Sequence, residues 1–401
     1  MIKNNRNEKD HVLAGKKRKV VICVLTGAFL LNSGAAFAVV SCRALNASTP
    51  RTDDIPLAPV NISAGVDMPN GTVLYRGSWF GGTPDYQIIC STNTSPERFY
   101  YTFKLGIQSA PRPLSAWSGS PYAGKVYETG IPGIGVAITD GNSAVTLDAP
   151  FANGGNRSGT IESGSKNFRV MGSTRYINFI KIGNIIPGRY PLTAANLPTA
   201  KIFFDNPAGQ ANVSGFPITS NILRYSGSIT ISSQTCSTPD VNVPMGKYDA
   251  DIDLSGIGSS TPWVDVNLEM RNCPTFNGYY NNANTVSLFN FTTGGTGSIP
   301  SSTNNRIGLR LSPNTSVISN SSGIMAIDST VDEAASGVGI QIGWGRPVPV
   351  PFRLDQEQVM DLPKDGSPTI RIPLSARYTQ IANRITPGRA DGKATFTINY
   401  Y

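Results

Sequence analysis

The chain has 401 residues, of which 39% are hydrophobic and 15% are charged, so two domains with full cores are expected. The charged fraction is below the roughly 25% that is usual for soluble globular proteins, and the 41 Gly and 29 Pro argue against long helical bundles. The formal charge of +8 does not indicate a nucleic-acid partner. Seven Lys/Arg and two Asp/Glu lie in residues 1–38, which leaves 27 minus 24, or +3, for the rest. Nucleic-acid recognition would need a clustered basic face.

The first 38 residues have the pattern of an export signal. A basic stretch at 16–19 precedes an apolar stretch at 20–31, and small residues follow at 36–38. Twelve apolar residues span about 18 Å of helix, against a hydrocarbon core of about 30 Å. This length favours cleavage over a membrane anchor. We therefore expect export and a mature chain that begins near Val39.

Cleavage would remove His11, the single histidine, together with Cys23. The mature chain could then build neither a Ser-His-Asp or Cys-His catalytic set nor a zinc site that needs histidine. We expect no catalytic residues, no metal and no cofactor. An even number of cysteines in an exported protein predicts two disulfides, here among Cys42, Cys90, Cys236 and Cys273.

A weak internal repeat spans about half the chain. Besides the two cysteine pairs, residues 133–138 are similar to 337–342, and the Pro-Gly-Arg at 187–189 recurs at 387–389. This order predicts two related domains, with the disulfides Cys42–Cys90 and Cys236–Cys273. A connector rich in Gly, Pro and Asn places the boundary near residue 220, giving domains at 39–220 and 221–401.

The local pattern is that of strands. Apolar and polar residues alternate from 264 to 270, and further strands are expected at 86–90, 201–204 and 227–231. No amphipathic helical stretch longer than two turns is present. The sequence therefore predicts an all-β protein of two antiparallel β-sandwich or barrel domains.

The C-terminal tail alternates plainly. Ala394, Phe396, Ile398 and Tyr400 fall on one side, and the residues between them are polar. Only twelve residues follow Arg389, whereas the first half has room for two more strands after its own Pro-Gly-Arg. This difference predicts that the second domain is one strand short. An ordinary last strand of a complete sandwich is the alternative.

Residues 222–401 resemble the pilin domain of bacterial chaperone–usher fimbriae. Pilins end in an alternating strand with a penultimate aromatic residue and a glycine fourteenth from the end, positions held here by Tyr400 and Gly388. The resemblance implies an incomplete immunoglobulin-like sandwich without its seventh strand. It implies a periplasmic chaperone, an outer-membrane usher and an adjacent strand-donating subunit as partners. The residues assigned to the assembly strand are Gly388, Ala394, Phe396, Ile398 and Tyr400.

Only three residues, 39–41, precede Cys42 in the expected mature chain, so no donor arm is expected there. A subunit that accepts a strand and donates none would end a fibre. The whole chain thus resembles a two-domain tip adhesin of type 1-like fimbriae, exported through the periplasm to the fimbrial tip. Residues 39–220 would form the lectin-like, receptor-binding domain.

Sugar sites combine aromatic faces with polar groups, which suggests Trp79, Asp85, Trp117 and Tyr122, all near Gly-rich or Pro-rich segments. Core packing is the alternative for Trp79. Resemblance to the mannose-binding members adds Asn93 in the loop after Cys90. The acidic residue expected beside Asn93 is Thr94, and Val39 is not aromatic, so the sequence does not indicate mannose. The sequence leaves three kinds of receptor as alternatives: a host glycan, a glycoprotein or a protein.

Two other functions are compatible with parts of the sequence. A structural minor or capping subunit would share the C-terminal features but bind no glycan. A secreted glycosidase needs only two carboxylates, and the first domain contains several, but no pair has a recognisable motif. The sequence therefore predicts a protein that is not an enzyme.

Overall fold

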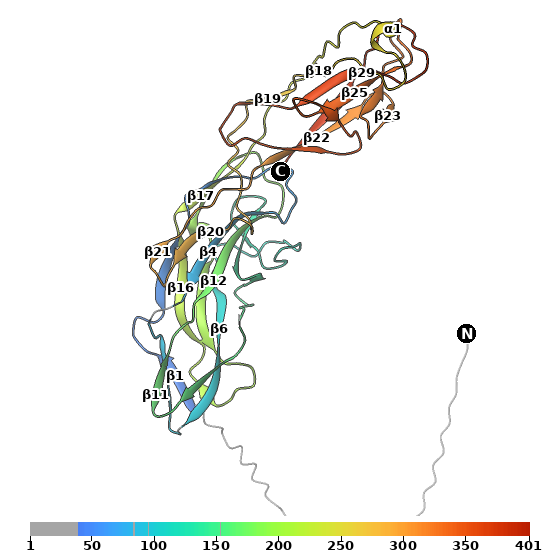
Figure 1. The fold of residues 1–401 in the computed structure, drawn as a ribbon. Coiled ribbons are helices and arrows are strands. Elements are labelled where there is room, and N and C mark those ends of the chain that lie inside the picture. Colours follow the sequence, from blue (N-terminus) through green and yellow to red (C-terminus); the bar gives the residue numbers. More distant parts are fainter. Residues whose placement is uncertain (1–38, 83–84, 95, 153) are drawn as a thin grey trace, which may run out of the picture. The chain divides into compact units, whose positions relative to one another are not determined.

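The computed structural model describes residues 39–82, 85–94, 96–152 and 154–401, so the expected signal peptide lies outside the described residues. Strands dominate the fold (Figure 1), which confirms the all-β class. The helices among the described residues are α1 (Ala250–Asp253) and a 3-10 turn, η1 (Ala194–Asn196). No helix in this described part is long and apolar enough to cross a membrane.

Four sheets contain the strands of the first half. One sheet has the order β11-β5-β1-β15, with β1 (Val40–Ala44), β5 (Ile88–Thr92), β11 (Ser165–Phe168) and β15 (Val213–Ser214). A second has the order β10-β6-β14-β16-β2, with β2 (Arg51–Pro56), β6 (Glu97–Ser109), β10 (Arg157–Ile161), β14 (Thr199–Asp205) and β16 (Ile218–Ser226). A small sheet, β13-β17-β3, joins β3 (Asn61–Ser63), β13 (Gly188–Thr193) and β17 (Ser228–Ser233).

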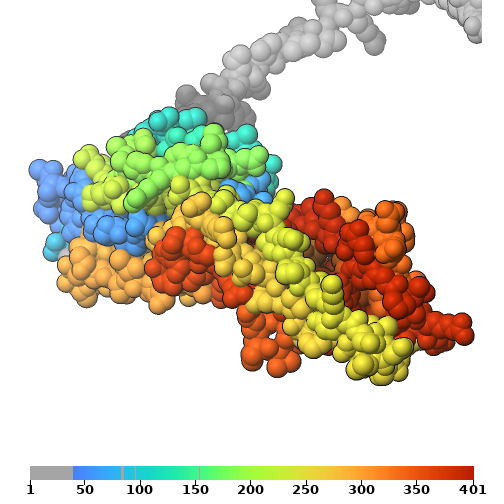
Figure 2. Space-filling model, turned by 90° about the horizontal axis from the view of Figure 1, so that it is seen from above, coloured from blue at the N-terminus to red at the C-terminus, as the bar shows by residue number. Residues whose placement is uncertain are grey.

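The remaining sheet of the first half also takes strands from the second half. Its order is β21-β20-β4-β12-β8-β7, with β9 (Ser143–Ala144) paired to β8. The strands are β4 (Val73–Gly81), β7 (Tyr127–Glu128), β8 (Ile134–Asp140), β12 (Ser173–Lys181), β20 (Val286–Asn290) and β21 (Gly295–Thr296). Strand β20 pairs in parallel with β4. Figure 2 shows these orange residues on the surface beside blue residues of the first half.

Three sheets make up the rest of the second half. The largest is β18-β29-β25-β24-β23 with β26 paired to β25, and comprises β18 (Val264–Asp265), β23 (Val317–Ser319), β24 (Ile324–Ala326), β25 (Val338–Trp344), β26 (Val350–Pro351) and β29 (Leu374–Gln380). The pair β19-β28 comprises β19 (Glu269–Arg271) and β28 (Thr369–Arg371). The sheet β27-β22-β30 comprises β22 (Arg306–Pro313), β27 (Gln358–Asp361) and β30 (Ala394–Tyr400).

Both predicted disulfides are confirmed. Cys42 bonds to Cys90 between the paired strands β1 and β5, and Cys236 bonds to Cys273 in the second half. Each bridge closes a loop within one half, which stabilises that half by restricting its unfolded chain.

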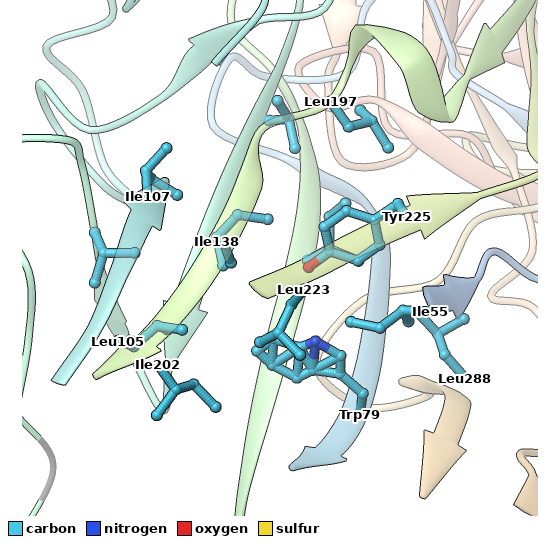
Figure 3. Packing of buried hydrophobic residues seen from close by; sticks show 14 of the residues in the cluster. Ile55, Trp79, Leu105, Ile107, Ile138, Leu197, Ile202, Leu223, Tyr225 and Leu288 are labelled. Carbon is cyan, nitrogen blue, oxygen red and sulfur yellow. The ribbon is translucent and has the colours of Figure 1, made fainter. Parts of the chain in front are cut away.

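Two large hydrophobic cores correspond to the two halves. The first includes Trp79, Tyr225 and Leu223 (Figure 3), and the second includes Leu309 and Tyr400. The first core also takes Leu288 from β20, so a strand late in the sequence completes it. Strand β16 runs across the boundary predicted near residue 220, and that boundary stays a prediction.

Most predicted strands are present, with one interruption. The strand predicted at 264–270 is split into β18 and β19, although its burial still alternates. Asn267 has a φ of 53°, and its backbone N–H donates to Asp265 Oδ1 at 2.9 Å. This local hydrogen bond replaces ladder pairing and turns the chain between the two short strands.

Candidate functional site

Among the residues that the structure describes, strand β30 lies at the edge of its sheet and pairs with β22 alone. The register runs antiparallel from Ile307 opposite Tyr400 to Pro313 opposite Ala394. An edge strand presents unpaired backbone groups unless another segment covers it. The alternating tail predicted from the sequence is therefore an open strand in the structure.

The register shows which backbone groups of β30 face away from β22. Arg306 and Tyr401 exchange both backbone hydrogen bonds, at 2.8 and 2.7 Å. Hydrogen-bonded pairs alternate along an antiparallel ladder, so the N–H and C=O groups of Ala394, Phe396 and Ile398 point to the free edge. Among the described residues, none of these three has a backbone hydrogen bond on that side. Three consecutive outward positions are thus open to a further strand.

The same three residues carry side chains that are only half-buried. Ala394, Phe396 and Ile398 pack against the second core without being enclosed. The segment 238–249 forms no strand, yet its Val241 and Met245 also pack half-buried against that core. The second core is therefore incompletely covered along two segments that present apolar side chains.

The C-terminal end of the open edge is already capped. The backbone N–H of Tyr400 donates to the Asp67 carboxylate at 2.8 Å, and Asp67 N–H donates to the Tyr400 carbonyl at 3.0 Å. The buried phenol of Tyr400 accepts from the Cys236 N–H at 3.1 Å and donates to Met270 Sδ at 3.7 Å. Burial raises the pKa of this phenol. These contacts fix the penultimate residue and end the free edge at Ile398.

Gly388 lies where two segments approach closely. A Cβ atom at this position would be 2.2 Å from the Glu333 carbonyl oxygen and 2.8 Å from Ala335 N. A bridge between Ala334 and Arg389 runs beside it. Any larger residue at this position would therefore clash with the backbone of the neighbouring segment.

Of the two roles considered for Trp79, the structure shows core packing and not an exposed sugar-binding ring. Trp79 lies in strand β4, is 2% exposed and packs in the first core (Figure 3). The strand is paired on both sides at Trp79, with β12 on one side and β20 on the other. Its indole lies 5.9 Å from the Arg175 guanidinium, so it supports a buried charge instead of a ligand.

Trp117 and Tyr122 are brought together on the long segment between β6 and β7. Both are half-buried against a small apolar cluster that contains Val126 and Ile180. Trp117 Nε1 donates to the Pro121 carbonyl at 2.8 Å, and the indole covers Gly119, whose Cβ would lie 2.5 Å from the ring. The indole therefore shapes this loop while leaving part of its surface accessible.

Asp85 and Asn93 are both exposed but lie apart. Asp85 precedes β5 and Asn93 follows it, and the five residues of that strand span roughly 16 Å. The structure does not gather the residues proposed from the sequence into one site. As ligand contacts, Asp85, Asn93, Trp117 and Tyr122 stay predictions.

A cavity of about 140 Å³ in the first half was not expected from the sequence. It is lined chiefly by Phe103, Asp140, Arg157, Met171, Ser173 and Arg175. Asp140 and Arg175 are each 3% exposed and form an ion pair at 3.2 Å. A sequence signal was available for Asp140, which ends a strand that is otherwise almost wholly apolar, and buried charges are usually paired or functional.

Comparison with known families gives a match in the second half. The family model described as fimbrial protein matches residues 224–401. A fimbria adhesin protein of Klebsiella pneumoniae is 25% identical over 380 residues, which cover 92% of this chain and 97% of the relative.

Two solved structures are also similar. The CupB6 tip adhesin of Pseudomonas aeruginosa is 15% identical with a TM-score of 0.32, and the match covers 89% of this chain and 91% of that one. The receptor binding domain of the adhesin MrkD1P of Klebsiella pneumoniae is 21% identical with a TM-score of 0.26. That match covers 49% of this chain and 98% of the domain.

Proposed function

We propose, on the premise that this chain belongs with the fimbrial adhesins, that it is a non-enzymatic tip adhesin incorporated by strand donation from a neighbouring subunit. The observation that carries the proposal is the free edge of β30. Its open backbone groups at Ala394, Phe396 and Ile398 coincide with half-buried apolar side chains. A donated strand would form hydrogen bonds with these backbone groups and bury these side chains.

The energetic gain from such a strand is large. About four donor side chains would be buried, at roughly 1.5 to 3 kcal/mol each, or about 6 to 12 kcal/mol in total. This rivals the roughly 5 to 15 kcal/mol that stabilises a whole domain. Before assembly, a periplasmic chaperone would supply the missing strand, and an outer-membrane usher would exchange it for that of the adjacent subunit.

The pairing of strand β1 supports the proposed terminal position in the fibre. Strand β1 begins at Val40 and is paired on both sides, with β5 and with β15. These residues are not available as a donor arm. A subunit that accepts but does not donate would occupy the fibre tip at the cell surface, with residues 39–220 as the receptor-binding half.

A strand appended to the C-terminus tests the acceptor function. We expect a flexible linker and seven alternating Val and Thr residues to raise the thermal unfolding midpoint of the second half, because the strand can return antiparallel along β30. The matched control replaces each Val by Asp, and we expect no gain from it. Equal midpoints for both appended forms and the unmodified chain would contradict an open acceptor edge.

The receptor is proposed to be a glycan, by analogy with the lectin-like halves of such adhesins. Half-exposed Trp117 and Tyr122, with exposed Asp85 and Asn93, offer the aromatic and amide groups that sugar sites use. A panel of immobilised glycans presented to the strand-complemented chain separates the alternatives. A capping subunit would bind none. A protein-directed adhesin would also bind none, but it would still bind its protein receptor after that receptor is deglycosylated.

A further inference from the structure

We infer that the cavity beside the Asp140–Arg175 pair binds the carboxylate of an acidic sugar, an inference that rests on the proposed adhesin function of the first half. The cavity measures about 140 Å³. Liquid water occupies about 30 Å³ per molecule, so the space equals roughly four or five waters. This space can take a carboxylate and the adjoining part of a sugar ring, but not a whole oligosaccharide.

Four strands and the loops beside them form the walls. Phe103 lies in β6, Asp140 ends β8, Arg157 begins β10, and Ser173 and Arg175 lie in β12. Met171 is 54% exposed and lies in the loop before β12. Most walls of the cavity thus belong to paired strands, which favours a preformed site.

The buried ion pair provides a rigid and nearly neutral floor. Arg175 Nη1 donates to the Gly81 carbonyl at 3.2 Å, and the Ser173 hydroxyl lies 3.4 Å from Asp140 Oδ2. Burial lowers the pKa of Arg175, while the charge and hydrogen bonding of Asp140 oppose that shift. Because the charges of Asp140 and Arg175 offset each other, the net charge of the cavity lining is set by the third charged residue.

That third residue is Arg157, whose guanidinium lacks an acidic partner among the described residues. It lies 5.2 Å from the Phe103 ring centroid, and Nη1 donates to Met171 Sδ at 3.2 Å. Its Nε is buried and makes no hydrogen bond within the described chain. A thioether is a weak acceptor, whereas a carboxylate accepts two parallel hydrogen bonds from arginine. An anionic ligand group is therefore favoured at this position.

The other lining groups favour a sugar over an acidic peptide side chain. The Ser173 hydroxyl and the Asp140 carboxylate supply oxygen atoms that accept hydrogen bonds from ligand hydroxyls. Phe103 and Met171 supply apolar surface for the C–H face of a ring. An Asp or Glu side chain would satisfy Arg157 but bring no hydroxyl donors to the opposite wall.

Calorimetric or NMR titration of the full, strand-complemented chain tests the inference. The probes are N-acetylneuraminic acid and glucuronic acid, compared with neutral N-acetylglucosamine and glucose. We expect at least one acidic sugar to bind at least tenfold more tightly than both neutral sugars. Arg157→Gln should weaken that binding at least tenfold, and Arg98→Gln should change it less than twofold. Arg98 is a matched control because it is exposed on the neighbouring strand β6 and pairs there with Thr160.

A second variant separates sugar recognition from simple charge attraction. Ser173→Ala should weaken binding of the acidic sugar without changing the affinity for acetate. Equal binding of acidic and neutral sugars, an unchanged affinity in Arg157→Gln, or acetate binding as tightly as the sugars would overturn the inference. Thermal unfolding of the same samples reports strand acceptance separately. A failure of sugar binding with strand acceptance intact would therefore leave the proposed assembly function standing.

Discussion

Two buried tyrosines differ in whether their hydroxyl groups have partners. The Tyr400 hydroxyl accepts from Cys236 N–H at 3.1 Å, whereas the buried Tyr225 hydroxyl makes no hydrogen bond among the described residues. A lost hydrogen bond costs about 1 kcal/mol, while removal of an unsatisfied group is neutral or favourable. The same Tyr→Phe change should therefore have opposite effects at the two positions.

We predict that Tyr400→Phe lowers the free energy of unfolding by about 1 kcal/mol at pH 8, and that Tyr225→Phe leaves it unchanged or raises it by up to about 1 kcal/mol. Burial, with a smaller contribution from Tyr75, raises the pKa of Tyr225 in the folded chain. The unfolded phenol ionises from about pH 10, so the chain loses stability as the pH rises above that value. Tyr225→Phe should reduce this alkaline loss. Denaturant titrations of the unmodified chain and of each variant at pH 8 and pH 10.5 check both effects. If Tyr225→Phe lost as much unfolding free energy between the two pH values as the unmodified chain does, the second prediction would be contradicted.

Individual side-chain roles were the least predictable from sequence. Trp79 lies among glycines, which suggested a loop, yet those glycines belong to a strand. A Cβ at Gly77 would be 2.8 Å from Leu288 Cδ1, so this glycine admits a side chain from 211 positions later in the sequence. The composition around Gly77 does not indicate a contact with a residue so distant in the sequence. The cysteine pairs and Tyr400 were predictable, because their spacing from each other or from the chain end carries the information.

At the scale of the element, β30 was predicted well because its alternation has a period of two residues. The structure adds that the apolar positions and the outward backbone groups are the same residues. Burial along the strand follows the pattern, with Thr395 and Thr397 exposed and Phe396 half-buried. A charge introduced on the half-buried face of this strand should therefore weaken docking of a further strand, whereas a charge on the exposed face should have little effect.

Paired substitutions test this difference. Phe396→Asp should remove the gain in unfolding midpoint that an appended Val-Thr strand gives, because the charge would be buried beneath the incoming strand. Thr397→Asp, one residue away on the exposed face, should keep most of the gain. The appended forms of both variants are compared by thermal unfolding with their parents. A retained gain in Phe396→Asp would show that the strand docks elsewhere.

At the scale of the whole molecule, the two halves are less separate than the repeat in the sequence suggests. The repeat predicted the two cores and their disulfides. It did not predict that β20, with Val286 and Leu288 fully or nearly buried, would extend the sheet of the first half. A parallel pairing of β4 and β20 joins residues about 210 positions apart, and alternating patterns give no information about the partner strand.

This pairing makes the first half depend on residues beyond the predicted boundary. Leu288 is 4% exposed in the first core, so Leu288→Ala should cost about 2 to 5 kcal/mol and speed amide exchange in β4 and β12. Leu309→Ala, a matched deletion in the second core, should act first on β22 and β30. Hydrogen exchange of the strand-complemented chain, followed by mass spectrometry, resolves the two regions. Unchanged exchange in β4 and β12 of Leu288→Ala would mean that β20 does not join that sheet in solution. The expected result would instead show that a fragment ending at residue 220 lacks part of its own core, so that receptor binding must be measured on the full chain.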